Sequence, residues 1–368
     1  MDSAAVRALF PVTERLIFLN NAAESPLSLP VRRRLKDYLD LAEQAPHRRP
    51  PARNPVRLLL ARLLGGLPEE YALVPSTGVG LGLAAAGYAW APGDNVVVPA
   101  EEHWNNTFPW LALRDRGVEV RIVPIEADLR VAPARIADRV DSRTRMVAVA
   151  AVRHTTGFRA DLKRVSRIAR DRGALFVVDG IQAAGVMPLN VAEDGIDVLA
   201  CAGFKWLLGM PGTGFLYVRK GVWDRIRPTL PGMFSAADDL SELRWLPSAQ
   251  RYETGTLPYS LFHAWTAGLE LILEIGVPAI QARVLELTSR LIEGLHTKGM
   301  QVVSPVESQQ ERSAIVSFTA GSQEANQALL GRLTERAIAI SLRGGRCRVS
   351  PSFYNNEEEI DRFLGTLA

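Results

Sequence analysis

The chain has 368 residues, of which 47% are hydrophobic and 23% are charged, as expected for a soluble globular protein with two domains. The 43 basic and 40 acidic residues leave a net charge of only +3, which argues against a nucleic-acid-binding surface. Two cysteines form neither a disulfide framework nor a metal set, and the five histidines lack ligand spacing, so no metal is expected. No apolar run is long enough for a membrane helix and no signal peptide is apparent, so we expect a cytoplasmic protein without membrane contact.

The first part of the chain predicts helices. Leu29–Ala45 has an amphipathic helical pattern with Ser28 as a suitable N-cap, and a second helix is expected from Val56 to Leu64. The stretch Ala45–Pro55 between them contains four prolines, so we expect no regular structure there. It is either a surface segment or an active-site loop, whose arginines could help to admit a larger or anionic substrate.

From about residue 70 to residue 220, short apolar runs alternate with helical patterns. This alternation is typical of a mostly parallel sheet covered by helices on both faces. The expected strands are Asn95–Pro99, Glu119–Val123, Met146–Val152, Ala174–Asp179, Val198–Cys201 and Gly214–Val218. The helical patterns are Gly78–Trp90, Trp104–Arg116, Pro133–Val140 and Leu162–Arg172. Ligands bind such sheets outside the carboxyl ends of the strands.

The rest of the chain predicts a smaller α+β unit after a long helical region. That region runs from Pro258 to about Lys298, with a break at Gly276-Val277-Pro278. The expected strands and helices that follow are Gln301–Ser304, Ser313–Thr319, Ala339–Arg343 and Cys347–Ser350, and Gln323–Arg336 and Glu357–Leu367. We therefore expect an N-terminal segment at residues 1–15, a large α/β domain at residues 16–250, and the helical connection with the small domain at residues 251–368.

An acid and a lysine stand at the ends of two expected strands. Asp179 closes one apolar strand, and Lys205 follows the next one, between Phe204 and Trp206. A buried carboxylate needs a cationic partner, and a lysine among aromatic rings has the lowered pKa that an amine nucleophile requires. Taken alone, Asp179 could be a helix cap and Lys205 a surface residue. Together they suit a pyridoxal phosphate (PLP) enzyme, where the carboxylate pairs with the pyridinium nitrogen and the lysine forms a Schiff base.

Four other features could serve the same site, and each also has an ordinary structural explanation. The turn Pro75–Gly80 opens a helix whose free N–H groups could bind a phosphate, although Ser, Thr and Gly are also common caps. Trp104 opens the next helix, where its ring could cover a planar cofactor or simply pack. His154 follows a strand as a polar loop residue, and Gln182 could donate to a cofactor oxygen.

In this order, these residues resemble the class V aminotransferase family, whose best-known branch is the cysteine desulfurases. The resemblance covers almost the whole chain. It rests on segments similar to the family's L-D-N-A-A, E-H-H-x-N-x-x-P-W, D-x-x-Q, G-x-K, R-F-E-x-G-T and C-R-x-S motifs. These segments are Phe18-Leu19-Asn20-Asn21-Ala22-Ala23, Glu102-His103-Trp104-Asn105-Asn106-Thr107-Phe108-Pro109-Trp110, Asp179-Gly180-Ile181-Gln182, Gly203-Phe204-Lys205-Trp206, Arg251-Tyr252-Glu253-Thr254-Gly255-Thr256 and Cys347-Arg348-Val349-Ser350.

The resemblance implies an α/β fold of fold type I, with a large domain built on a mostly parallel seven-stranded sheet and a smaller C-terminal α+β domain. It implies pyridoxal 5′-phosphate as the cofactor, with Lys205 as the Schiff-base lysine and Asp179 as the partner of the ring nitrogen. The other implied cofactor contacts are Gln182 and His154 at the ring oxygen, Trp104 on the ring, and Thr77 and Gly78 at the phosphate.

The resemblance also implies which residues meet the substrate and the partner subunit. Thr256 would reach the phosphate from a partner, which implies a homodimer with a shared active site. Arg348 would grip the substrate carboxylate with its planar fork. Asn21 and Ala22 would also lie at the substrate.

Several departures from the family pattern concern the chemistry. Desulfurases carry a nucleophilic cysteine on a loop before the C-R-x-S strand, whereas the stretch Ser341–Arg346 contains no thiol. Cys347 lies in the strand motif itself and is expected to pack. Ala202 and Phe204 replace a serine and a histidine, and Gly78 replaces a threonine, so the phosphate would depend on backbone groups or on Thr256. Persulfide transfer is therefore not expected.

The sequence thus predicts a PLP-dependent enzyme acting at the amino group and Cα of an amino acid or amino-acid conjugate. The substrate amine would displace Lys205 to form an external aldimine, and the freed lysine would move the Cα proton. A C–S or other β-elimination lyase, or an aminotransferase without a catalytic cysteine, is favoured over an epimerase of the same family.

Two other classes of protein stay open. One is a non-catalytic PLP-binding regulatory or scaffold protein, which an intact Asp179 and Lys205 disfavour. The other is a nucleotide-binding enzyme that uses the turn Ser76–Gly80, which the lack of a G-x-G-x-x-G turn disfavours.

Overall fold

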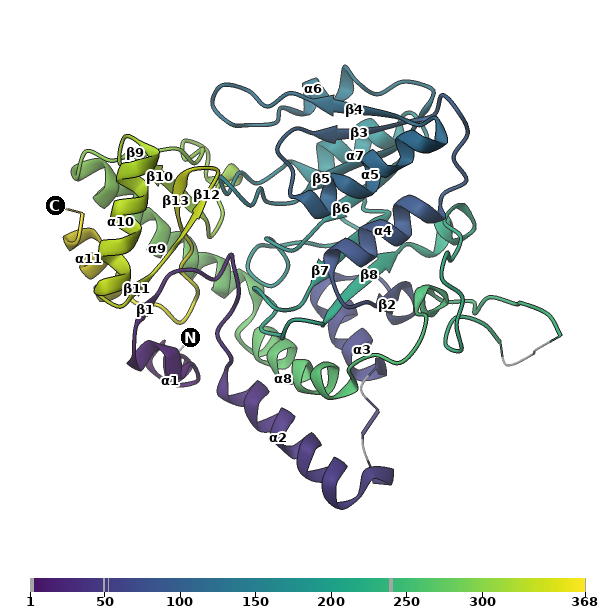
Figure 1. The fold of residues 1–368 in the computed structure, drawn as a ribbon, viewed down its shortest axis with the longest axis horizontal. Coiled ribbons are helices and arrows are strands. Elements are labelled where there is room, and N and C mark those ends of the chain that lie inside the picture. Colours follow the sequence, from purple (N-terminus) through teal and green to yellow (C-terminus); the bar gives the residue numbers. More distant parts are fainter. Residues whose placement is uncertain (1–2, 49, 52, 238–240, 368) are drawn as a thin grey trace.

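The structure is a computed structural model that describes residues 3–48, 50–51, 53–237 and 241–367. Its strands form a seven-stranded sheet, a four-stranded sheet and a two-stranded pair. Figure 1 shows the four-stranded sheet, built from the C-terminal part of the chain, beside the larger sheet. Within the described residues, no helix combines the length and the apolarity needed to cross a bilayer.

The large sheet has the strand order β2-β8-β7-β6-β5-β3-β4. The five strands β4, β3, β5, β6 and β7 are parallel to one another, whereas β8 is antiparallel to both β7 and β2. This strand order confirms the predicted mostly parallel seven-stranded sheet. Strands buried on both faces are continuous apolar runs, which is why they could be recognised in the sequence. The strands are β2 (Tyr71–Leu73), β3 (Asn95–Pro99), β4 (Glu119–Val123), β5 (Thr144–Ala150), β6 (Leu175–Asp179), β7 (Val198–Ala202) and β8 (Gly214–Val218).

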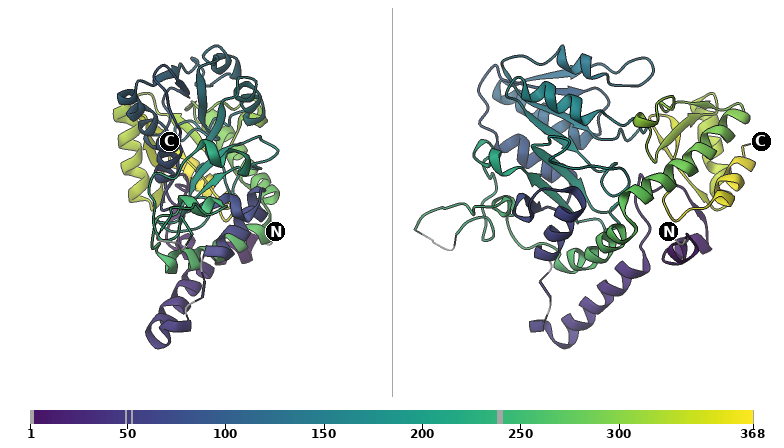
Figure 2. Two further views of the ribbon diagram at one scale, coloured as in Figure 1. Left: turned by 90° about the vertical axis from the view of Figure 1, so that its right-hand side faces the viewer. Right: turned by 180° about the vertical axis from the view of Figure 1, so that it is seen from behind.

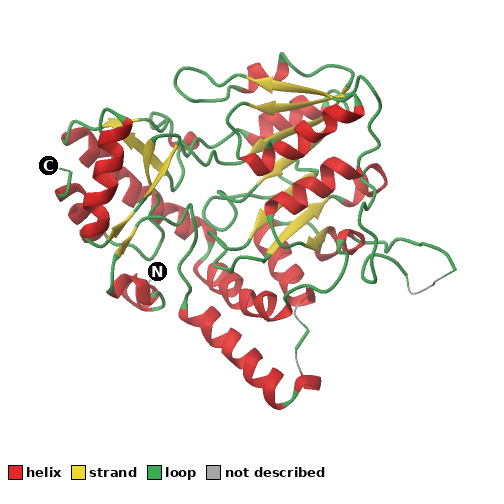
Figure 3. Cartoon of the chain, viewed as in Figure 1, coloured by secondary structure: helices red, strands yellow, loops and turns green. Residues whose placement is uncertain are grey.

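Helices cover both faces of this sheet (Figures 1 and 3). On one face lie α3 (Arg53–Leu64), α7 (Leu162–Arg170) and α8 (Tyr259–Ile275), with α6 (Pro133–Ala137) beside α7. On the other face lie α4 (Thr77–Gly87) and α5 (Phe108–Leu111). Alternate strand residues supply the two cores, as Val97 and Val96 illustrate.

The small sheet has the order β12-β13-β10-β9 and is antiparallel throughout. One face of this sheet packs against helices, and the opposite face carries polar side chains. On that polar face, the Ser317 hydroxyl donates to the Thr155 carbonyl, in the loop after β5, at 2.5 Å. The small sheet therefore presents a polar face to the large one. Its strands are β9 (Gln301–Val302), β10 (Val316–Thr319), β12 (Ser341–Arg343) and β13 (Arg346–Val349), and α9 (Val277–Thr297), α10 (Gln323–Glu335) and α11 (Glu357–Gly365) pack on its apolar face.

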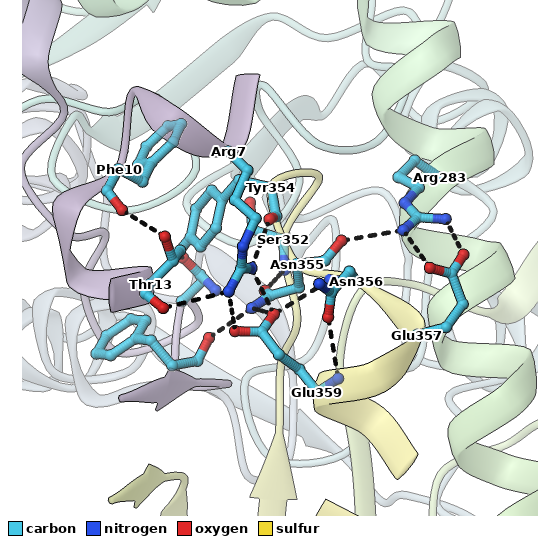
Figure 4. Close-up of polar contacts among 12 residues, drawn as sticks. Arg7, Phe10, Thr13, Arg283, Ser352, Tyr354, Asn355, Asn356, Glu357 and Glu359 are labelled. Carbon is cyan, nitrogen blue, oxygen red and sulfur yellow. Dashed lines mark hydrogen bonds and ion pairs between the residues drawn. The ribbon is translucent and has the colours of Figure 1, made fainter. Parts of the chain in front are cut away.

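The N-terminal segment packs against the C-terminal part of the chain. It contains α1 (Ser3–Ala8) and β1 (Ile17–Phe18), and β1 pairs in parallel with β11 (Ile338–Ala339). Arg7 forms an ion pair of 2.9 Å with Glu359 and donates a hydrogen bond of 3.2 Å to the Tyr354 carbonyl (Figure 4). Ile17 and Leu19 share the core of the small sheet. The domain limits at residues 16–250 and 251–368 stay a prediction.

Two helical regions match the sequence-based expectation closely. Helix α2 (Leu29–Gln44) is the amphipathic N-terminal helix, and it extends away from the sheets in both views of Figure 2. The long helical connection divides into α8 and α9 at Gly276, which has a φ of 84° and precedes Pro278 by two residues. A left-handed glycine followed by proline ends one helix and begins the next.

Two other regions differ from the expectation because of where proline lies. The expected helix Trp104–Arg116 is three short pieces, Trp104–Asn106, Phe108–Leu111 and Ala112–Arg116, and Pro109 stands in the first turn of the second piece. Helix α3 begins at Arg53, inside the stretch expected to be irregular, and Pro46–Arg48 forms a 3₁₀ turn. A proline in the first turn loses no helical hydrogen bond, so Pro55 is compatible with α3. Residues 49 and 52 lie outside the described residues.

Candidate active site

A cavity lies at the carboxyl ends of the strands of the large sheet. Side chains from the ends of β5, β6 and β7, from the loop after β3 and from the start of α4 meet there. This is where a mostly parallel sheet binds its ligands. The lining residues are Ser76, Thr77, His103, Asn105, Ala150, Val152, His154, Asp179, Ile181, Gln182, Ala202, Phe204 and Lys205.

Asp179 and Lys205 are the two charged residues of the cavity lining, and both are buried. Burial raises the pKa of Asp179 to about 6, although the Ile181 N–H, at 3.0 Å, and the charge of Lys205 act to lower it. Burial lowers the pKa of Lys205 to about 8, and the charge of Arg348 acts in the same direction. An amine with this pKa has a neutral, nucleophilic fraction near pH 7, as Schiff-base formation requires.

Thr77 and Gly78 form the first turn of α4 at the edge of this cavity. The Thr77 hydroxyl accepts a hydrogen bond of 2.9 Å from the Ala202 N–H, which ties the start of α4 to the end of β7. A Cβ at Gly78 would lie 3.1 Å from the Asn105 side chain, so a glycine suits this close approach. N–H groups in the first turn have no partner in their own helix and can bind an anion.

Trp104 does not line this cavity, and its predicted place on the cofactor ring stays a prediction. Its side chain is 70% exposed, and its ring lies parallel to the Phe108 ring, with the centroids 6.5 Å apart. His103 lines the cavity instead, as the N-cap of the turn that begins at Trp104.

His103 and His154 form an imidazole pair in the cavity. Their ring centroids are 5.1 Å apart and the rings are nearly perpendicular, at 81°. The Asn105 N–H donates to Nδ1 of His103 at 3.2 Å, so the neutral ring carries its proton on Nε2. Burial lowers the pKa of His154 to about 3, with the charges of His103 and Arg348 adding to the effect. His154 is therefore neutral at pH 7 and offers one N–H donor.

Gln182 also lies in the cavity, with most of its amide engaged. Its Nε2 donates to the Ala22 carbonyl at 2.9 Å, and its Oε1 accepts from Nε1 of Trp206 at 2.9 Å. One N–H of the amide remains for a ligand, and its donation to a cofactor oxygen stays a prediction.

Arg348 approaches the cavity from β13 of the small sheet and is 1% exposed. Its Nη1 donates to the His154 carbonyl at 2.8 Å, and its Nε donates to the Ser341 hydroxyl at 3.2 Å. Its buried Nη2 has no hydrogen-bond partner among the described residues. An unpaired buried guanidinium nitrogen is costly and therefore suits the binding of an anionic group such as a carboxylate.

Three other predicted residues lie outside this cavity. The Asn21 side chain donates to the Ser350 carbonyl at 2.9 Å and accepts from the Tyr354 hydroxyl at 2.6 Å, while the Ala22 carbonyl holds Gln182. These bonds position the site, and a direct contact of Asn21 or Ala22 with the substrate stays a prediction. Thr256 is exposed and lines a different cavity, so its contact with a partner's phosphate also stays a prediction.

Glu102 is a buried acid beside the cavity to which the sequence assigned no role. Burial raises its pKa to about 7, although the charge of Arg153 opposes this, and its carboxylate accepts from the Ala150 N–H at 3.0 Å. It joins the chain after β3 to the end of β5. The sequence contained a signal for Glu102 and His103, because both polar residues lie within four positions of the carboxyl end of an apolar strand.

The chain matches the family model described as aminotransferase class-V over residues 17–363. A probable cysteine desulfurase of Methanothermobacter thermautotrophicus is 30% identical over 406 residues, covering 100% of this chain and 98% of the relative. The apo structure of a cysteine desulfurase from Thermococcus onnurineus NA1 is 26% identical, with a TM-score of 0.90 and coverage of 98% and 96%. C-DES, described as a cystine C–S lyase, shares the fold at 22% identity, with a TM-score of 0.91 and coverage of 98% of both chains.

The cavity fits the cofactor that these comparisons indicate. The C-DES structure was solved as a mutant with glycine covalently linked to its PLP cofactor. Here, Lys205 and Asp179 supply the amine and the carboxylate, and the first turn of α4 supplies N–H groups that can bind a phosphate. The unpaired Nη2 of Arg348 can bind an anionic group. The chain belongs to the class V aminotransferase family and is a PLP-dependent enzyme of fold type I.

Proposed function

We propose that the protein is a PLP-dependent lyase that removes a β-substituent from an amino acid, most directly by cleaving a C–S bond, without a cysteine nucleophile. The comparisons support C–S chemistry, since the relative reported above is named a probable cysteine desulfurase and the two structural neighbours are a cysteine desulfurase and a cystine C–S lyase. The inaccessibility of both thiols of this chain carries the distinction from a desulfurase.

The chain has two cysteines, Cys201 and Cys347, and both are 0% exposed. Burial raises the pKa of each thiol, to about 12 for Cys347. Cys347 points to the apolar side of β13, where its Sγ lies 3.7 Å from Oδ1 of Asn326. A buried thiol with a raised pKa is inert as a nucleophile, so neither cysteine can accept sulfur from a substrate.

The turn before β13 offers no substitute. Strands β12 and β13 are joined by Gly344 and Gly345, whose φ angles are 56° and 74°. Two left-handed residues between paired strands form a tight hairpin turn, which has no room for an extended nucleophile-bearing loop.

The residues of the site can carry out an elimination. PLP, when bound, withdraws electrons from Cα of the substrate. Arg348 binds the substrate carboxylate with its free Nη2, and Asp179 holds a positive charge at the ring nitrogen in a buried setting. Lys205, in its neutral form, takes the Cα proton on Nζ. The Cβ–S bond then breaks, its electron pair leaves with sulfur, and hydrolysis of the remaining enamine gives a keto acid and ammonia.

We also propose a homodimer with a shared active site, in which Thr256 of one subunit meets the cofactor phosphate of the other. Thr256 is exposed and lies away from its own chain's cavity, which supports a role in a partner's site. A cytoplasmic location is part of the same proposal, because both cysteines are free and a reducing compartment keeps them so.

Product analysis with a panel of amino acids tests the proposed reaction. Elimination releases ammonia and a keto acid in equal amounts and leaves the cofactor spectrum unchanged after turnover. Transamination yields a keto acid without ammonia and converts the cofactor to its amine form. Ammonia release that tracks keto acid release supports the lyase. A keto acid formed without ammonia identifies an aminotransferase and contradicts the proposal.

A further inference from the structure

The β12–β13 hairpin turns a face rich in arginine toward the active site. In the antiparallel register, Ser341 pairs with Arg348 and Arg343 pairs with Arg346. Directly paired residues project from the same face, as do residues two apart along one strand. Arg343, Arg346 and Arg348 therefore share one face of the hairpin, while Leu342 and Cys347 project into the core of the small sheet.

This is the face that meets the cavity. Arg348 donates to the carbonyl of His154, which lines the cavity, and Ser317, which pairs with Arg348 on the neighbouring strand, donates to the Thr155 carbonyl. Burial is the main cause of the lowered pKa values of His103 and Lys205, and the charge of Arg343 contributes to both. The guanidinium of Arg343 is thus within electrostatic reach of the residues at the centre of the site.

Arg343 and Arg346, the two outer arginines, have no acidic partner among the residues that the structure describes. Within the described part of the chain, neither Arg343 nor Arg346 forms an ion pair, and Nη1 of Arg343 donates only to the neighbouring Leu342 carbonyl, at 2.8 Å. Arg343 is exposed and Arg346 half-buried. Like charges directly opposite each other destabilise a strand pair, so the pairing of Arg343 with Arg346 costs stability unless an anion lies near it.

We infer that the substrate carries a second anionic group, distal to its α-carboxylate, and that Arg343 binds it at the mouth of the cavity with Arg346 beside it. Arg348 has one free nitrogen, which a single α-carboxylate satisfies, so a distal anion needs a separate cation. This inference rests on the proposed function and deepens it. The substrate class becomes an amino acid whose β-substituent, joined through sulfur, ends in an acidic group.

A matched pair of ligands separates this role from general binding. S-carboxymethyl-L-cysteine and S-carboxamidomethyl-L-cysteine differ only in whether the distal group is a carboxylate or an amide. Rapid mixing of the holoenzyme with each, followed by cofactor absorbance before the first turnover, gives a Kd ratio for the two ligands. A charged hydrogen bond at Arg343 predicts a preference of at least about tenfold for the acid. Arg343→Gln should lower that ratio to near one, and Arg343→Lys should retain part of it, because it keeps the charge but loses the planar fork.

Arg332→Gln is the matched control, since Arg332 is an exposed arginine on α10 of the same region. It should leave the ratio unchanged. Equal binding of both ligands to the unaltered protein, or an equal weakening of both by Arg343→Gln, would show that Arg343 does not bind a distal anionic group. Loss of PLP from Arg343→Gln would assign the arginine to the cofactor and overturn the inference. If neither ligand perturbs the spectrum, the proposed function fails, and the inference with it.

Discussion

The guanidinium of Arg348 donates a hydrogen bond of 2.8 Å to the backbone carbonyl of His154. This bond joins β13 of the small sheet to the loop that follows β5 of the large sheet. It holds Arg348, whose Nη2 has no hydrogen-bond partner among the described residues, close enough for its charge to lower the pKa of Lys205. The site thus depends on two segments that are far apart in the chain, because Arg348 and His154 are separated by 194 positions.

The lowered pKa of Lys205 predicts how cofactor uptake depends on pH. The neutral amine is the nucleophile, and it predominates above its pKa, which burial lowers to about 8. The rate at which cofactor-free protein takes up PLP should therefore rise with pH and level off above about pH 8. Stopped-flow absorbance at several pH values measures this rate. A rate that still rises steeply beyond pH 10 would show that Lys205 has the pKa of an ordinary exposed lysine.

Asp179→Asn should keep the shape of the site and remove its buried negative charge. Without the carboxylate, the positive charge at the cofactor ring is no longer stabilised, so kcat should fall by about 10²–10³-fold. Steady-state kinetics measure the loss, and circular dichroism shows whether the fold is retained. A folded variant with nearly full activity would remove Asp179 from its proposed role.

His103, rather than Trp104, should contribute to cofactor affinity. His103→Ala removes a ring that lines the cavity, and the loss of aromatic contact of about 0.5–1.5 kcal/mol corresponds to a weakening of PLP binding of about two- to tenfold. Trp104→Ala, at an exposed ring one residue away, is the matched control and should change PLP affinity less. Equilibrium dialysis of PLP measures both affinities. A larger loss of affinity in Trp104→Ala than in His103→Ala would support the predicted contact of Trp104 with the cofactor ring.

The sequence carried enough information for the large sheet and for the central pair of the site. The strands β6 and β7 stood out because strands buried on both faces are continuous apolar runs, and Asp179 ends the first of these runs while Lys205 follows the second. Strand β2 was missed because it has three residues, too few for a recognisable pattern.

Side-chain direction and strand register were beyond what the sequence could indicate. Whether His103 or Trp104 faces the cavity depends on the backbone angles of one turn, which two adjacent aromatic residues do not encode in their spacing. The shared face of Arg343 and Arg348 depends on a two-residue hairpin that sets the register of β12 and β13. A shift by one residue would place them on opposite faces.

Glu359 anchors the N-terminal segment and should matter for stability. Its carboxylate accepts from Arg7, from Nδ2 of Asn355 at 2.9 Å and from the Asn356 N–H at 3.1 Å (Figure 4). Glu359→Gln removes the charge from a largely buried pair and should lower the free energy of unfolding by about 1.5–3 kcal/mol. Urea denaturation measures this. Glu358→Gln alters the exposed neighbour and should cost about 0.5 kcal/mol or less, and equal losses in the two variants would contradict the anchoring role.

The most direct test of a thiol-independent lyase is the fate of L-cysteine incubated with the holoenzyme. Elimination adds one water to each cysteine and releases pyruvate, ammonia and sulfide, whereas sulfur transfer to a protein thiol leaves alanine and a protein persulfide. Chromatography of the products, with mass spectrometry of the protein, distinguishes the two reactions. Equimolar pyruvate and ammonia with no persulfide on Cys201 or Cys347 is the predicted result. Alanine together with a persulfide on either cysteine would contradict the account.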